Sequence, residues 1–103
     1  MSRPRGLDSA RHQLARAFRL RGYVRRQDKR RLTREGYMRY KKGDEVRLMA
    51  NSAAEVMLLQ RLLRRAGFKP GRAFAKGRQY RQPIYGREQV RQFLEMVDAL
   101  EDA

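Results

Sequence analysis

The spacing of apolar residues alternates along this chain between the period of an α-helix and that of a β-strand, and this alternation constrains the fold most. Apolar side chains recur every three or four positions in residues 9–21, 52–66 and 87–100, which predicts three helices. Strand-like pairs of segments lie between them, within 23–50 and 72–85. The order predicts an α+β protein, a single αββαββα domain whose helices pack on one face of an antiparallel sheet.

The second predicted helix has the clearest boundaries. Ser52 and Glu55 have the spacing of a capping box, in which the Ser52 side chain accepts from the Glu55 amide and the Glu55 side chain reaches back to the Ser52 amide. Gly67 follows the last apolar position of this helix and is expected to end it.

The start of the chain reads as a basic flexible tail over residues 1–8, followed by a single domain over residues 9–103. Asp8 or Ser9 is expected to cap the first helix, because both side chains accept hydrogen bonds from free backbone amides. Gly22 stands where a left-handed residue would end that helix.

Residues 45–50 alternate with the period of a strand. One face would carry Val46, Leu48 and Ala50, and the other would carry Glu45, Arg47 and Met49. In the second strand pair, Pro83 predicts an edge strand or an early strand end, because proline has no amide hydrogen for a sheet ladder.

The charge balance restricts the function. Among 103 residues there are 26 Lys and Arg against 11 Asp and Glu, a formal net charge of +15. Self-repulsion of this size is relieved when an anionic partner neutralises it, and nucleic acid is the first candidate. The net charge is +11 over residues 1–49, +7 over 50–86 and −3 over 87–103, so the last helix is expected to lie away from the polyanion.

The sequence offers little for catalysis. The chain has no cysteine and only one histidine, which excludes a disulfide framework, a thiolate nucleophile and a cysteine zinc site. No motif places a pair of carboxylates, a Ser-His-Asp set or a phosphate-binding glycine loop. We therefore expect no enzyme activity, no cofactor, no metal and no small-molecule substrate.

Two groups of residues are candidates for phosphate binding, because guanidinium and ammonium groups pair with phosphate oxygens. The first group follows the first predicted strand and comprises Arg25, Arg26, Lys29, Arg30, Arg31 and Arg34. The second group lies on the predicted sheet and comprises Arg47, Arg72, Lys76, Arg78, Tyr80 and Arg81. In the second group, Tyr80 would offer an aromatic surface for base stacking.

The element order and several segments resemble a LAGLIDADG-type domain, as in homing endonucleases and intron maturases. Residues 14–24, with the sequence LARAFRLRGYV, are similar to the signature helix and first strand of that family, and residues 45–48, 62–68 and 85–90 are similar to later elements. The resemblance implies a saddle of strands that lies on DNA or RNA. It also implies a homodimer through the helix of residues 9–21.

The chain departs from the family pattern at the signature helix. The acidic positions that hold the catalytic metal in the family fall at Arg19 and Arg21, and Arg16 replaces a small residue where two such helices approach each other. Because a cation repels a divalent metal, the resemblance implies binding without cleavage.

The leading prediction is a non-catalytic nucleic-acid-binding protein of the cytoplasm, with RNA favoured over DNA. The alternative is a structural or ribosome-associated protein of a ribonucleoprotein particle, since such chains are often small, arginine-rich and free of cysteine. An adaptor for an acidic protein or an anionic membrane is a further alternative. No apolar run approaches the roughly 20 residues of a membrane span, and we expect no membrane partner.

Overall fold

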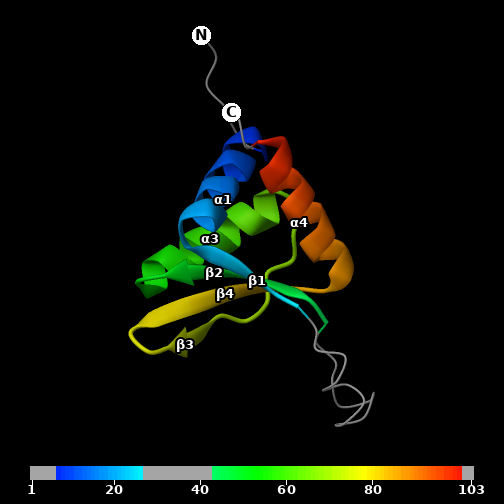
Figure 1. Cartoon of the computed structure of the whole chain (residues 1–103). Coiled ribbons are helices and arrows are strands. Elements are labelled where there is room, and N and C mark those ends of the chain that lie inside the picture. The colour runs from blue at the N-terminus through cyan, green and yellow to red at the C-terminus, as the bar shows by residue number, and fades with distance from the viewer. Residues whose placement is uncertain (1–6, 27–42, 101–103) are drawn as a thin grey trace, which may run out of the picture.

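The structure is a computed structural model, and it describes residues 7–26 and 43–100. Within these residues, helices stack on one side of a four-stranded antiparallel sheet, as Figure 1 shows. The elements are α1 (Leu7–Arg21), β1 (Gly22–Arg25), β2 (Glu45–Ala50), α3 (Ala53–Arg65), β3 (Phe74–Lys76), β4 (Gln79–Tyr85) and α4 (Arg87–Ala99). The predicted α+β class and αββαββα order are confirmed.

The sheet has the strand order β1-β2-β4-β3, and every neighbouring pair is antiparallel. The register pairs Val46 with Ile84 and Leu48 with Gln82. All four of these side chains are buried, and the Gln82 amide hydrogen-bonds to Gln60 of α3, so this side of the sheet faces the helices. The predicted division of β2 into two faces is confirmed.

The core lies between the helices and the sheet. Its buried apolar side chains come from every helix and from the two central strands: Ala10, Leu14, Ala15, Val46, Leu48, Ala50, Val56, Leu59, Leu62, Leu63, Ala66, Phe68, Ile84, Val90, Phe93, Met96 and Val97. Phe93 of α4 sits at its centre, with its ring 5.7 Å from that of Phe18 and 5.4 Å from that of Phe68. The helical spacing of apolar residues therefore marks the buried faces correctly.

The ends of α3 follow the sequence closely. Ser52 Oγ accepts a hydrogen bond from the Glu55 amide at 3.2 Å, as predicted. The Glu55 carboxylate instead accepts from the Asn51 amide at 2.7 Å, one residue earlier than in a standard capping box. Gly67 ends the helix with φ +91, and the Phe68 amide donates to the Leu63 carbonyl at 2.8 Å, which is the Schellman arrangement.

The first helix begins earlier than predicted; it ends at Arg21 as predicted, but not through a left-handed glycine. Helix α1 begins at Leu7, so Asp8 and Ser9 lie inside it, and the predicted tail of residues 1–8 overlaps the helix. Gly22 does not have a positive φ and is the first residue of β1. A Cβ at Gly22 would lie 2.8 Å from the Phe18 Cα, so glycine is needed there because the chain folds closely back on the helix.

The prediction that Pro83 marks an edge strand is also wrong, because Pro83 lies inside β4, between β2 and β3 in the sheet. β3 pairs with β4 only as far as Arg81, so no β3 residue faces Pro83. On the side of β4 away from β2, the Pro83 carbonyl accepts a hydrogen bond from the Gly71 amide at 2.9 Å. In an antiparallel strand the nitrogen and the carbonyl of one residue point to the same side, so the Pro83 nitrogen also points away from β2. The missing amide hydrogen therefore removes no bond from the ladder.

No helix in the described part of the chain is long and apolar enough to cross a lipid bilayer.

Candidate nucleic-acid interface

The side of the sheet opposite the helices is left uncovered by the described elements, and we call it the bare face (Figure 1). The strand register assigns to it every second residue of each strand. These residues are Tyr23 and Arg25 of β1, Glu45, Arg47 and Met49 of β2, Gln79, Arg81, Pro83 and Tyr85 of β4, and Phe74 and Lys76 of β3. Helix α4, which carries the acidic residues Glu88, Glu95 and Asp98, packs on the opposite side of the sheet.

Arg47 is the centre of a cluster on the bare face. Its guanidinium pairs with Glu45 Oε1 at 2.7 Å, donates to the Tyr23 hydroxyl at 3.4 Å and lies 5.0 Å from the centre of the Phe74 ring. Arg81 Nε donates to the same hydroxyl at 3.3 Å. Residues from all four strands thus fix one another, which gives this face a rigid centre.

The electrostatics of the cluster follow from these contacts. Burial by itself would raise the pKa of Tyr23, but hydrogen bonds from Arg47 and Arg81 and their positive charges outweigh it and lower the pKa below its usual value of 10.0. Burial would lower the pKa of Arg47, but its contacts with Tyr23 and Glu45 raise it. Both shifts favour the charged forms.

The sequence predicts that Arg47 docks phosphate, but the surroundings of Arg47 favour a different role. Its side chain is 11% exposed and that of Glu45 is 3% exposed, so the pair is largely withdrawn from solvent. Glu45 also lies 3.5 Å from Arg25. Glu45 Oε2 and Arg47 Nε are buried and have no hydrogen-bond partner within the described part of the chain. Arg47 holds the face together with its charge already neutralised.

The basic residues after β1 are only partly described. Arg26 is exposed and forms an ion pair with Asp44 at 2.9 Å. Lys29, Arg30, Arg31 and Arg34 lie outside the described residues.

The β3–β4 hairpin carries further exposed cations on this side, which, unlike Arg25, are not paired with Glu45. Arg72 precedes β3, Lys76 ends it, and Arg78 lies in the turn to β4, where Gly77 has φ +63. All three are exposed, and none of them forms a salt bridge with a described residue. Of the predicted set, these residues are the best placed to meet a phosphate backbone.

The placement of Tyr80 as a stacking residue beside the arginines is wrong. Tyr80 pairs with Ala50 in the ladder and packs against the core, so its ring lies on the helix side of the sheet. Its neighbour Arg81 is on the bare face. Adjacent residues of a strand point to opposite sides, so the two side chains could not share one face.

Sequence reasoning missed the rings that do lie on the bare face. A hollow of about 600 Å³ there is lined by Arg47, Arg72, Ala73, Phe74 and Tyr85. Phe74 stands two positions before Lys76 in the same strand, and Tyr85 stands four positions after Arg81. Residues separated by an even number of positions in a strand lie on the same face, so these separations from basic residues are the signal that would have found both rings.

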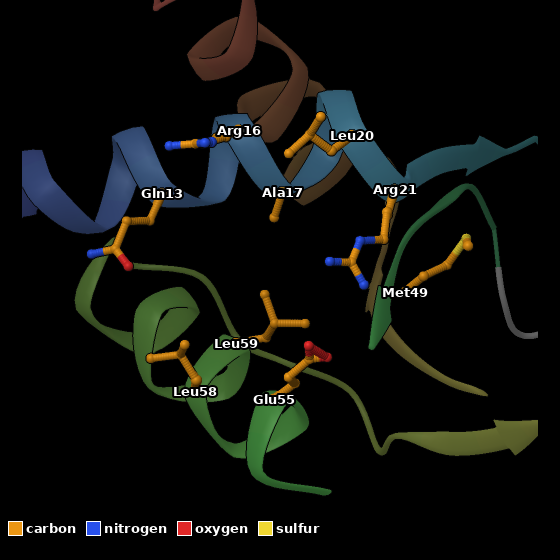
Figure 2. Close-up of a pocket in the computed structure, with 9 residues that line it drawn as sticks. All are labelled: Gln13, Arg16, Ala17, Leu20, Arg21, Met49, Glu55, Leu58 and Leu59. Carbon is orange, nitrogen blue, oxygen red and sulfur yellow. The ribbon is translucent and has the colours of Figure 1, made fainter. Parts of the chain in front are cut away.

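A second hollow, of about 290 Å³, lies between α1 and α3 and is shown in Figure 2. Ala17 of α1 and Leu59 of α3 point toward one another across it, and Arg16 and Arg21 lie along its α1 side. Leu20 is 68% exposed and Leu58 is 44% exposed, and both line it. This groove combines apolar surface with two arginines and the carboxylate of Glu55.

A metal site is not formed by the described residues, which contain no group of three or more His, Cys, Asp or Glu side chains suited to a cation. Arg19 and Arg21, at the positions that would be acidic in a LAGLIDADG signature, are both exposed near the end of α1.

Comparison of the chain with protein-family models, with curated proteins and with solved structures finds no match. The resemblance to LAGLIDADG-type domains remains a prediction from the sequence.

Proposed function

We propose that this chain is a non-catalytic nucleic-acid-binding protein that docks its ligand on the bare face, with RNA favoured over DNA. The carrying observation is that the exposed cations Arg72, Lys76 and Arg78 border a sheet surface that also presents the rings of Phe74 and Tyr85. Cations neutralise phosphates and rings stack on bases, and the two together are typical of nucleic-acid surfaces. RNA is favoured because proteins read RNA mostly at unpaired bases.

Binding should depend steeply on salt. If the protein neutralises about six phosphates of a duplex, the slope of log K against log salt should be near −5, and about −4 on a single strand. Fluorescence anisotropy with labelled RNA and DNA across a salt series measures this slope. A flat salt response would contradict the proposal.

Two variants of equal charge test where the ligand lies. The first replaces Arg72, Lys76 and Arg78 by alanine, and the second replaces Arg61, Arg64 and Arg65, which are exposed on α3, on the helix side of the sheet. The hairpin variant should reduce the salt slope by about 2 and weaken binding, since each lost phosphate contact removes roughly 0.7–0.9 from the slope. The α3 variant should keep a slope close to that of the wild type. Equal losses in both would mean that net charge alone drives binding.

The α1–α3 groove favours a second candidate function, a subunit of a ribonucleoprotein particle. In that setting the bare face contacts RNA and the groove holds an apolar helix of a neighbouring protein whose flanks are acidic. Arg16 and Arg21 outnumber Glu55 at the groove and would attract such flanks, whereas two copies meeting through α1 would bring these cations against each other.

Analytical ultracentrifugation tests this second candidate. The isolated chain should sediment as a monomer. The double variant Leu20→Glu and Leu58→Glu should no longer co-sediment with the ribonucleoprotein particle. The same variant, once purified, should still bind RNA. A homodimer that these substitutions dissociate would instead identify a second copy as the occupant.

A further inference from the structure

The hollow on the bare face has the size and lining of a ligand site. Its volume of about 600 Å³ lies within the roughly 300–1,000 Å³ of small-molecule pockets. Its lining combines the Phe74 and Tyr85 rings with the guanidinium groups of Arg47 and Arg72, and it includes no carboxylate. The lining therefore suits a flat, aromatic ligand that carries negative charge.

The Phe74 ring is held in place before any ligand arrives. The Arg47 guanidinium lies 5.0 Å from its centre, and Arg47 is itself fixed by Glu45 at 2.7 Å and by the Tyr23 hydroxyl at 3.4 Å. Because the charge of Arg47 is matched by Glu45, Arg47 acts on this site by positioning the ring.

The Tyr85 ring is held on the other side of the hollow by the chain that leads into β3. A Cβ added to Gly71 would clash with Cε2 of Tyr85 and would lie 2.8 Å from its Cδ2 and 3.3 Å from Pro83 Cγ, so the ring packs closely against the glycine. The Gly71 amide is tied to the Pro83 carbonyl at 2.9 Å, and its carbonyl accepts from the Gln82 amide at 2.7 Å. Glycine at position 71 thus makes room for the ring.

The cation left to bind the ligand is Arg72. It is exposed, lines the hollow and forms no salt bridge with a described residue. It lines the hollow together with the rings of Phe74 and Tyr85, so its charge is near both rings.

We propose that this hollow takes one unpaired nucleobase of a single-stranded nucleic acid, which stacks on the Tyr85 ring, beside Phe74, while Arg72 pairs with the adjoining phosphate. This inference rests on the proposed function and adds a preference for single strands. A base in a duplex is covered on both faces by its neighbours, so it reaches a ring only after it leaves the stack.

The test compares single strands with duplexes at one salt concentration. The probes are a labelled oligouridylate and oligothymidylate of about eight nucleotides and an RNA duplex of equal length. The wild type should bind the single strands about tenfold more tightly than the duplex. If the oligouridylate and the oligothymidylate bind equally, the site recognises base and phosphate; a preference for the oligouridylate adds a contact to the ribose hydroxyl, which also supports the site.

Substitutions at the hollow separate stacking from charge. Tyr85→Leu should weaken single-strand binding about tenfold with the salt slope and duplex binding unchanged, and Tyr85→Phe should retain the affinity. Gly71→Ala, which displaces the ring without removing it, should also weaken single-strand binding. Tyr80→Leu is the matched control, because that ring lies on the helix side of the sheet. Circular dichroism establishes that each variant is folded.

Two outcomes overturn the inference, and they differ from each other. Salt-dependent binding that is equal for duplex and single strand, or that folded Tyr85→Leu leaves unchanged, removes the nucleobase site and keeps the proposed function. The absence of binding to every probe at low salt removes both.

Discussion

At the scale of single residues, Glu45 decides how positive charge is arranged on the bare face. It is the one acidic side chain among the described residues of that face, and it lies between Arg25 at 3.5 Å and Arg47 at 2.7 Å. Because Glu45 and Arg47 are both largely withdrawn from solvent, water cannot replace Glu45 in balancing the charge of Arg47. The cations of this face that form no salt bridge with a described residue are then Arg81 and those of the hairpin, 72–78.

We expect Glu45→Gln to lower the free energy of unfolding by about 3 kcal/mol, because it leaves the buried Arg47 charge without its partner. Urea denaturation measures the change. Glu95→Gln is the control, since Glu95 pairs with Arg91 at 2.6 Å on the exposed surface of α4 and should cost about 0.5 kcal/mol. Equal costs in the two variants would contradict the role given to Glu45.

Tyr23 should ionise at a lower pH than an ordinary tyrosine, because Arg47 and Arg81 stabilise its phenolate. The difference between the ultraviolet titrations of the wild type and Tyr23→Phe should show one phenol with a pKa below 10.0. Since the folded-state pKa is lowered, the free energy of unfolding of the wild type should gain a contribution as pH rises through that pKa toward 10, and should lose it as pH falls again. Tyr23→Phe should lack this contribution, and a difference titration at or above 10.0 would contradict the assignment.

At the scale of elements, the passage from α1 to β1 shows how a short connection fixes a strand. Gly22 follows the last helical residue directly and is already paired with Leu48 of β2. The strand leaves the helix so sharply that Gly22 touches the backbone of Phe18. β1 lies at the edge of the sheet, and its pairing with β2 places Tyr23 beside Arg47.

We expect Gly22→Ala to destabilise the protein by about 2 kcal/mol, because its Cβ would lie 2.8 Å from the Phe18 Cα and 2.9 Å from the Phe18 carbonyl oxygen, and backbone atoms yield little. Thermal unfolding measures the loss. Gly43→Ala serves as the control, since an added Cβ there meets nothing within 4 Å, and it should stay within about 0.5 kcal/mol of the wild type. Comparable losses would show that glycine flexibility, and not the contact, matters at position 22.

At the scale of the whole molecule, the two sides of the sheet carry different groups of side chains. The helix layer buries the core and ends with α4, whose exposed carboxylates Glu88 and Glu95 both pair with Arg91. The bare face presents the Phe74 and Tyr85 rings. Exposed arginines without a salt bridge to a described residue lie on both sides, and on the helix side they include Arg61, Arg64 and Arg65. With a formal net charge of +15, the chain also carries repulsion that its own carboxylates do not remove.

We expect salt to stabilise the free protein, because ions screen this repulsion over distances beyond about 10 Å at 0.1 M. Raising the salt concentration from about 0.02 to 0.5 M should increase the melting temperature by about 5 °C. The variant that replaces Arg61, Arg64 and Arg65 by alanine should respond less, since it carries less charge. A melting temperature that falls with salt would contradict this account.

Much of the fold was predictable because local chemistry decides it. Apolar spacing placed the three helices, and Ser52 and Gly67 marked the ends of α3 correctly, since caps act within a few residues. The prediction for Gly22 was wrong because a glycine after a helix can mark either a left-handed cap or a close approach of the backbone. Only the contact with Phe18 shows that the second explanation holds here.

What the sequence by itself determined is the order of the elements, the alternation within β2 and the surplus of positive charge, because each depends on neighbours in the chain. Only the tertiary structure decided which arginines are neutralised and which rings lie on the bare face. Arg47 meets Tyr23, Glu45 and Phe74 because β1, β2, β4 and β3 pair in one register. A strand turned by one residue exchanges its faces, so the sides taken by Tyr80 and Arg81 were set by pairing across the sheet.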